Sequence, residues 1–180
     1  MDYYVFLLLS SVWYIIPAYI ANAMACVFGG GTPLDGGKNF VDGRRLIGNG
    51  VTIKGTISGI TCGVIGSILQ YFVGNYFNID WMMFLNVGLM QYIILGLLLS
   101  SGALFGDMFG SFVKRRFNIS QGGSAPLWDQ LTFIVFALIF GYFYIPASLN
   151  MAILLILLSP IVHLISNIIA YKLGIKKVWW

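Results

Sequence analysis

Residues 83–113 read MFLNVGLMQYIILGLLLSSGALFGDMFGSFV, an apolar run in which a single carboxylate, Asp107, is embedded. As a straight helix this run would be on the order of 45 Å long, whereas the hydrocarbon core of a bilayer is about 30 Å thick. We therefore predict a membrane-spanning helix that tilts or projects from the membrane at its charged end, next to Lys114. A helix that stays apolar over this length belongs in lipid, and this decides the fold class.

The composition of the whole chain agrees with that prediction. Of its 180 residues 59% are hydrophobic and only 9% are charged, against about 25% charged in ordinary soluble domains, and the mean hydropathy is +0.88. The apolar residues form long blocks along the chain. We predict an all-α integral membrane protein, one membrane domain over 1–180, with five transmembrane helices at about 4–28, 55–77, 83–113, 128–147 and 150–171.

The basic residues predict the orientation of these helices. All ten Lys and Arg residues fall in two long loops, about 29–54 and 114–127, or after the last helix, at Lys172, Lys176 and Lys177. Such a bias marks the cytoplasmic side, so we expect the N-terminus outside and the C-terminus inside. We read the net charge of +4 as a report of orientation and expect no nucleic acid partner. No sequence feature indicates a protein partner.

The second helix carries small residues at intervals of four, namely Gly55, Gly59, Gly63 and Ser67. Small residues at this spacing let another helix approach the backbone closely. The sequence leaves open whether that neighbour belongs to the same chain or to a second one.

The acidic residues gather near the basic side. All six are aspartates, and four are expected at or near the cytoplasmic loops: Asp35, Asp42, Asp107 and Asp129. Carboxylates suit Mg²⁺, and Arg or Lys suit phosphate. Together they favour a polyanionic ligand held with a divalent metal.

Asp107 and Asp129 are the strongest candidates for that metal. An ionisable group inside a membrane helix is expensive unless it faces a wet cavity or a partner. On a helix, Asp107 shares a face with Gly110, Ser111 and Lys114, which leaves room above the carboxylate. The alternative is an ion pair with a basic residue on another helix. Asp129 would lie in the first turn of the fourth helix, where it either stabilises the helix end or shares the metal with Asp107.

The remaining polar residues give weaker signals. The glycine-rich first loop departs from the P-loop pattern, since Thr32 stands where its first glycine belongs, but its glycines allow close backbone approach to phosphate. A helical spacing relates Ser159, His163, either Ser166 or Asn167, and Tyr171, and it predicts a polar stripe that faces the bundle interior or a cavity. With one histidine and no glutamate in the chain, we expect chemistry that needs little proton transfer.

Several motifs together resemble those of the CDP-archaeol synthase family, within the wider group of membrane CTP-transferases that includes CDP-diacylglycerol synthase. They are GGGTPLD, DGRRLIGNG and TIKG in the first loop, GDMFGSFVKRRFNI with PLWDQ around the second loop, and the His, Asn and Tyr stripe before KKVWW. Two positions depart from the group's pattern, since Thr132 replaces a second acid and Val51 a lysine.

The resemblance implies a function. It implies a membrane cytidylyltransferase in which the phosphate of digeranylgeranylglyceryl phosphate attacks the α-phosphorus of CTP, with Mg²⁺ as cofactor and pyrophosphate as the released product. It implies roles in metal binding and catalysis for Asp107, Lys114, Arg115, Arg116 and Asp129.

We combine residues and resemblance into one predicted site that faces the cytoplasm from the cell membrane. The catalytic residues are Asp107, Asp129 and Lys114, and the two aspartates hold Mg²⁺. The predicted nucleotide- and phosphate-binding residues are Asp35, Lys38, Asp42, Arg44, Arg45, Asn49, Thr52, Lys54, Arg115 and Arg116. Of these, Asp35, Lys38 and Asp42 either order the first loop or extend the site. The predicted lining of the lipid phosphate is Asn22, His163 and Asn167.

Parts of the sequence are compatible with two other functions. A small ion- or proton-coupled transporter would use Asp107 and His163 along its path, but it has no need of so many charges on one face. A CDP-alcohol phosphotransferase fits less well, because Leu46 and Ile47 follow DGRR where that family has another pattern.

Overall fold

Five α-helices make up the described part of the chain. The computed structural model describes residues 2–77, 79, 87–121, 123, 125 and 127–175. The helices are α1 (Tyr3–Val27), α2 (Ile53–Tyr76), α3 (Leu89–Arg116), α4 (Trp128–Tyr142) and α5 (Leu149–Lys172). Four of them are long and apolar enough to cross a membrane, and α4 is the exception with 15 residues, or about 22 Å. The all-helical architecture is thereby confirmed, but among the described residues four helices and not the predicted five reach the length of a membrane span.

Helix α3 runs further than predicted at its charged end. It ends at Arg116, three residues beyond the expected limit, so Lys114, Arg115 and Arg116 form its last turn instead of opening the second loop. Cations in a last turn are stabilised by the partial negative charge of the helix C-terminus. The predicted start at residues 83–86 lies outside the described residues, as do Asp80, Pro126, Lys176 and Lys177.

Helix α4 is shorter than predicted, because it ends at Tyr142 and not at residue 147. The amides of Tyr144 and Ile145 both bind the carbonyl oxygen of Gly141, each at 3.0 Å, which closes the last turn. Ile145 precedes Pro146, and the residue before a proline is driven out of the helical conformation.

The small-residue face of α2 packs within the same chain, which resolves the open alternative. A Cβ atom added at Gly59 would lie 2.7 Å from the carbonyl oxygen of Ala21 on α1, and one at Gly63 would lie 2.8 Å from that of Pro17. On the other side, Gly63 also faces Ser100 of α3. Helix α2 therefore contacts α1 and α3 almost backbone to backbone.

A proline inside α1 is compensated by a side chain of α2. Pro17 has no amide hydrogen, so the carbonyl oxygen of Trp13, four residues earlier, loses its helical donor. The side-chain amide of Gln70 donates to that oxygen at 2.7 Å. Since an unpaired carbonyl is costly in a bilayer, this bond stabilises the segment of α1 around Pro17 and holds it to α2.

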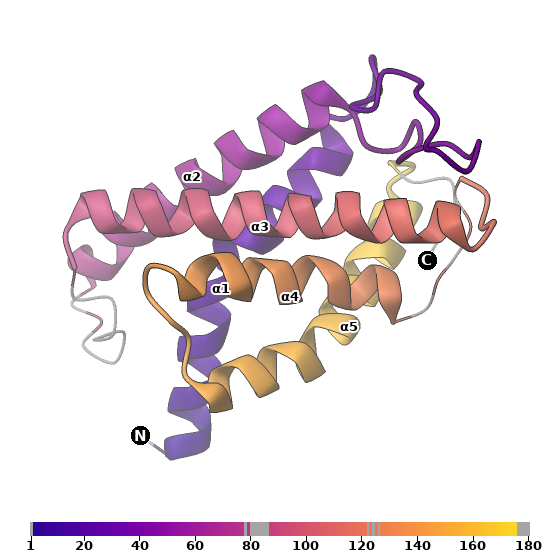
Figure 1. The fold of residues 1–180 in the computed structure, drawn as a ribbon. Helices are drawn as coiled ribbons and strands as arrows, with labels where there is room; N and C mark the ends of the chain where they lie inside the picture. Colours follow the sequence, from indigo (N-terminus) through magenta and orange to yellow (C-terminus); the bar gives the residue numbers. More distant parts are fainter. Residues whose placement is uncertain are drawn as a thin grey trace.

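Helix α3 lies between α2 and α4 and forms the centre of the bundle (Figure 1). Cβ atoms at Gly102 and Gly106 would lie 2.6 Å from the carbonyl oxygen of Phe136 and 2.7 Å from the Cα of Phe133, so α4 presses directly on α3. The first loop and the charged end of α3 lie together at the end of the bundle opposite the N-terminus (Figure 1).

We predict that Gly63→Ala destabilises the bundle by about 2–4 kcal/mol, because the added methyl group overlaps α1 and α3 and the helices must separate. The measurement is thermal unfolding of the purified protein in detergent. Gly74→Ala is the matched control, since its Cβ would meet only the Tyr92 hydroxyl, at 3.9 Å, and should leave the melting temperature nearly unchanged. Equal melting temperatures for the two variants would contradict the close packing of α2.

Candidate functional site

The first loop is a folded hairpin rather than a loose connection. The amide of Leu34 donates to the carbonyl oxygen of Val51 at 2.9 Å, and the amide of Ile53 donates to the carbonyl oxygen of Thr32 at 3.1 Å. Further along, the amide of Phe40 binds the carbonyl oxygen of Arg44 at 2.7 Å. The turns between these bonds use left-handed glycines, including Gly43 at φ 75°. The loop thus has a defined shape that can form one wall of a site.

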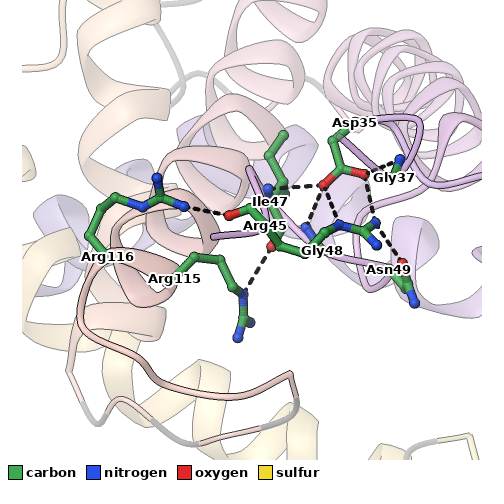
Figure 2. A network of polar contacts seen from close by, with 8 residues as sticks. All are labelled: Asp35, Gly37, Arg45, Ile47, Gly48, Asn49, Arg115 and Arg116. Atoms are coloured by element: carbon green, nitrogen blue, oxygen red, sulfur yellow. Dashed lines mark hydrogen bonds and ion pairs between the residues drawn. The ribbon is translucent and has the colours of Figure 1, made fainter. Parts of the chain in front are cut away.

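Asp35 is the buried centre of that loop. Its side chain is 0% exposed and accepts the Arg45 guanidinium at 2.8 Å and the amides of Gly48, Ile47 and Gly37 at 2.8, 3.0 and 3.0 Å (Figure 2). Burial alone would raise the pKa of Asp35, but the Arg45 charge and the three amides outweigh it and hold the pKa well below its ordinary value. Asp35 is therefore ionised at any physiological pH and orders the loop.

Two arginines of α3 fasten this loop to the helix (Figure 2). Arg115 donates from Nε to the carbonyl oxygen of Ile47 at 3.1 Å, and Arg116 donates to that of Arg45. Arg116 also pairs with Asp42 at 2.8 Å and lies over the Phe40 ring, 4.9 Å from its centroid. The last turn of α3 and the loop consequently form one unit.

A polar pocket of about 260 Å³ opens beside this unit. Asp107, Gly110, Ser111 and Lys114 of α3 all line it, so the predicted shared face of α3 is confirmed. The other helices and loops contribute Asn22, Gly50, Val51, Ala125, Asp129, Gln130, Thr132, His163 and Asn167. The structure therefore brings together all three residues predicted as catalytic and all three predicted to line the lipid phosphate.

Inside the pocket Lys114 and Asp129 form an ion pair of 2.7 Å between Nζ and Oδ1. The second carboxylate oxygen of Asp129 accepts the amide of Ala125 at 3.3 Å. The pair joins the end of α3 to the start of α4, whose preceding residue, Leu127, has a left-handed backbone at φ 65° and gives no side-chain cap. Asp129 is thus a carboxylate that the structure pairs with a lysine of a neighbouring helix.

The polar stripe of α5 only partly faces this pocket. His163 and Asn167 line it and bond to each other at 3.2 Å, and Ser159 is fully buried against the hydroxyl of Tyr19. Tyr171 is 47% exposed and does not join them. The helical spacing therefore predicts three of the four positions correctly.

All ten predicted nucleotide- and phosphate-binding residues lie outside the lining of this pocket. Asn49 accepts a hydrogen bond from Arg45 at 2.7 Å, while Lys38 and Lys54 are exposed. Thr52 caps α2, accepting the amides of Gly55 and Gly30, and lines a neighbouring cavity of about 160 Å³ that also reaches Asn22 and Asp107. The remaining members belong to the loop and α3 network: Asp35, Asp42, Arg44, Arg45, Arg115 and Arg116.

Two walls of the pocket, one from the first loop and one from α4, were not predicted from the sequence. Gly50 and Val51 of the loop, and Gln130 and Thr132 of α4, line it. The Thr132 hydroxyl is buried without a hydrogen-bond partner among the described residues. Two signals could have found it: its i, i+3 spacing from Asp129, which puts both residues on one face of α4, and its place where the related group has a second acid.

The described residues fit a metal only in combination with a ligand. Within the described ranges, no group of three or more His, Cys, Asp or Glu side chains gathers as a protein-only metal site would. Asp107 and Asp129 do line one pocket. Mg²⁺ is commonly held by one or two carboxylates together with substrate phosphates and water, and this donor set matches that arrangement.

An apolar groove of about 420 Å³ adjoins the pocket between α1 and α5. Its walls include Tyr19, Ala23, Val162 and Ala170. Three polar residues line both the groove and the pocket: Asn22, His163 and Asn167. A polar and an apolar compartment therefore meet at one row of side chains.

Comparisons with known proteins find similar chains over nearly the whole length. The family model described as CDP-archaeol synthase (CarS-like) matches residues 4–180. A CDP-archaeol synthase of Methanococcus maripaludis (strain C5) is 60% identical over 174 residues, 97% of this chain and 97% of its own. One of Methanocaldococcus jannaschii is 55% identical over 174 residues, 97% and 98% of the two chains. A solved structure, described as an intramembrane enzyme for archaeal membrane lipids biosynthesis, is 35% identical with a TM-score of 0.76, covering 89% of this chain and 94% of its own.

We predict that Asp35→Asn loosens the first loop by about 3 kcal/mol, because the Arg45 charge loses its partner. Hydrogen exchange of the 29–52 amides should accelerate, and the melting temperature of the helices should change less. Folding lowers the pKa of the Asp35 carboxyl, so this group stabilises the folded loop fully at pH values above its unfolded pKa, near 4. This stabilisation is lost as the pH falls from there toward the folded pKa.

The same loop in Asp35→Asn should therefore lack the acid-induced opening that the wild type shows below about pH 4. Asp42→Asn is the control, because its carboxylate is partly exposed and its loss should have a small effect. Unchanged exchange in Asp35→Asn would contradict the central role of Asp35 in the loop.

Proposed function

Because the chain belongs to the CDP-archaeol synthase family and is a membrane cytidylyltransferase of archaeal lipid synthesis, we propose that its polar pocket is where CTP and an isoprenoid glyceryl phosphate react. The observation that carries this proposal is the junction of the polar pocket with an apolar groove at Asn22, His163 and Asn167. An amphiphilic substrate needs both compartments at once, with its phosphate in the first and its chains in the second.

The reaction needs no general base. The lipid phosphate is a monoester with a second pKa of about 6, so it is largely ionised near neutral pH. One of its oxygens attacks the α-phosphorus of CTP, while the bond from that phosphorus to the bridging β-phosphate oxygen breaks and its electron pair leaves with pyrophosphate. The pocket supports such chemistry because its lysine and side-chain amides can align the two anions and offset part of their charge, while its two carboxylates would hold the Mg²⁺ that offsets more of it.

The residues of the pocket divide this work. Asp107 and Asp129 would hold Mg²⁺, which when bound supplies charge neutralisation to the triphosphate. Lys114 binds phosphate oxygens from the rim. Asn22, His163 and Asn167 hold the lipid phosphate where the groove meets the pocket. Asn and His side chains donate hydrogen bonds to phosphate without a permanent charge.

The arginines that join the first loop to α3 have a supporting role in this proposal. Arg45, Arg115 and Arg116 hold the loop on α3, and the loop presents Gly50 and Val51 to the pocket. More exposed cations remain available to phosphates of an incoming nucleotide, namely Lys38 and Arg44 of the loop and Lys54 in the first turn of α2.

We further propose that the loop end of the bundle faces the cytoplasm, where CTP is found, and that the N-terminus lies outside. The clustering of Lys and Arg at this end supports that orientation. The alternative of an ion- or proton-coupled transporter is not supported, since the chain has a cytidylyltransferase family's sequence over its whole length.

Asp107→Asn should lower turnover by about two to three orders of magnitude, because one charge aimed at the triphosphate and its metal is lost. The assay is pyrophosphate release by purified protein in detergent, with CTP and an isoprenoid glyceryl phosphate, with and without Mg²⁺. Asp2→Asn is the matched control, the same exchange at the N-cap of α1, where Asn also caps well. Near-wild-type turnover in a folded Asp107→Asn would remove Asp107 from catalysis.

Ala170→Phe should raise the KM for the lipid at least about fivefold and leave the KM for CTP nearly unchanged, because the ring fills the groove but not the pocket. Ile161→Phe is the control on the same helix, at a side chain that is 57% exposed on the outside of the bundle. A lipid KM that responds equally to both variants would argue against the groove as the lipid's place.

A further inference from the structure

The ion pair of Lys114 and Asp129 occupies the position on Asp129 that a divalent cation would need. Lys114 Nζ lies 2.7 Å from Oδ1, and Oδ2 already accepts the amide of Ala125. The Lys114 side chain is only 14% exposed, so its ammonium is inside the pocket and not in bulk water. A metal at the same oxygen would have this ammonium as its immediate neighbour.

Two cations do not share one carboxylate oxygen favourably, least of all in a partly buried place where water screens them poorly. Although the Asp107 carboxylate lines the same pocket, a divalent cation that is to bind Asp129 as well must displace Lys114. Displacement leaves the ammonium poorly paired, because Asp129 is the residue with which the structure pairs it. The free protein should therefore bind the metal weakly.

A triphosphate changes this balance. It offers several anionic oxygens to which a lysine can turn, since the lysine side chain has four flexible carbons and its ammonium donates in three directions. Arg115 and Arg116, the other cations of the same helical turn, hold backbone carbonyl oxygens of the loop and the Asp42 carboxylate. Lys114 is the member of this turn that lines the pocket.

We propose that Lys114 keeps the metal position on Asp129 closed until a nucleoside triphosphate arrives, and that it then passes from the carboxylate to the phosphates. Lys114 is thus a positioning residue that makes nucleotide and metal bind cooperatively. The inference rests on the proposed function, since it concerns the same pocket. Binding of each ligand must help the other by the same factor, and couplings of this kind commonly amount to about 5- to 150-fold.

A purely structural role for the pair predicts something different. Lys114 lies in the last turn of α3 and Asp129 in the first turn of α4, so each charge also suits its own helix end. If the pair served only to join the two helices, its removal would lower the melting temperature and leave metal affinity unchanged. Metal affinity therefore separates the two roles.

The experiment titrates purified protein in detergent with Mn²⁺ alone and follows free Mn²⁺ by electron paramagnetic resonance. Lys114→Gln should bind Mn²⁺ about tenfold or more tightly than the wild type, because Asp129 is released. The double variant Lys114→Gln with Asp129→Asn should lose this gain. Lys172→Gln is the matched control, the same exchange in the last turn of α5, outside the pocket lining, and should bind as the wild type does.

A second arm adds CTP without lipid, with correction for the Mn²⁺ that CTP binds in solution. In the wild type CTP should tighten Mn²⁺ binding at least about tenfold, and in Lys114→Gln by much less. Lys114→Arg, which keeps the charge, should bind Mn²⁺ alone as weakly as the wild type. Lys114→Met replaces Lys114→Gln if the latter shows a lowered melting temperature.

Equal Mn²⁺ affinity of the wild type and the neutral variants, or an unchanged effect of CTP, would overturn this inference. Such a result would leave the proposed function intact if the wild type still released pyrophosphate only with CTP and lipid together. Loss of that joint dependence would sink the proposed function instead, whatever the metal titration gave.

Discussion

The central position of α3 is possible because its neighbours touch its backbone directly. Gly63 of α2 faces Ser100 of α3, while Gly102 and Gly106 of α3 lie against the backbone of α4. In a bilayer, where lipid tails are as apolar as leucine, such close contacts replace the hydrophobic force that packs soluble proteins. Asp107 and Lys114 project from this helix into the polar pocket. The geometry of the pocket therefore depends on packing glycines outside its lining, such as Gly63, Gly102 and Gly106.

Part of the site could be predicted because the spacing of residues along a helix determines which face of the helix they share. Asp107, Gly110, Ser111 and Lys114 are three or four residues apart, and a regular helix puts them on one face wherever it lies. His163 and Asn167 follow the same rule on α5 and reach the same pocket. Tyr171 does not, because the stripe drifts out of the bundle toward the helix end.

The rest could not be predicted because it depends on partners that sequence spacing does not reveal. Arg45 was predicted to bind phosphate, and Asp35 either to order the loop or to extend the site; in the fold they pair with each other, and Asp35 also binds the loop backbone. A cation suited to phosphate is equally suited to a carbonyl oxygen, and only the folded loop decides between them. The predicted end of α4 was too late for a related reason, since Phe143, Tyr144 and Ile145 are apolar but lie outside the helix, ahead of Pro146.

The meeting of the groove and the pocket at Asn22, His163 and Asn167 has a kinetic meaning. One reactant diffuses in three dimensions through water and the other in two dimensions within the leaflet. The second reactant is therefore counted as a mole fraction of the surrounding amphiphiles, not as a volume concentration. Diluting the leaflet with inert lipid or detergent at constant total substrate slows such an enzyme, although every molecule it acts on is still present.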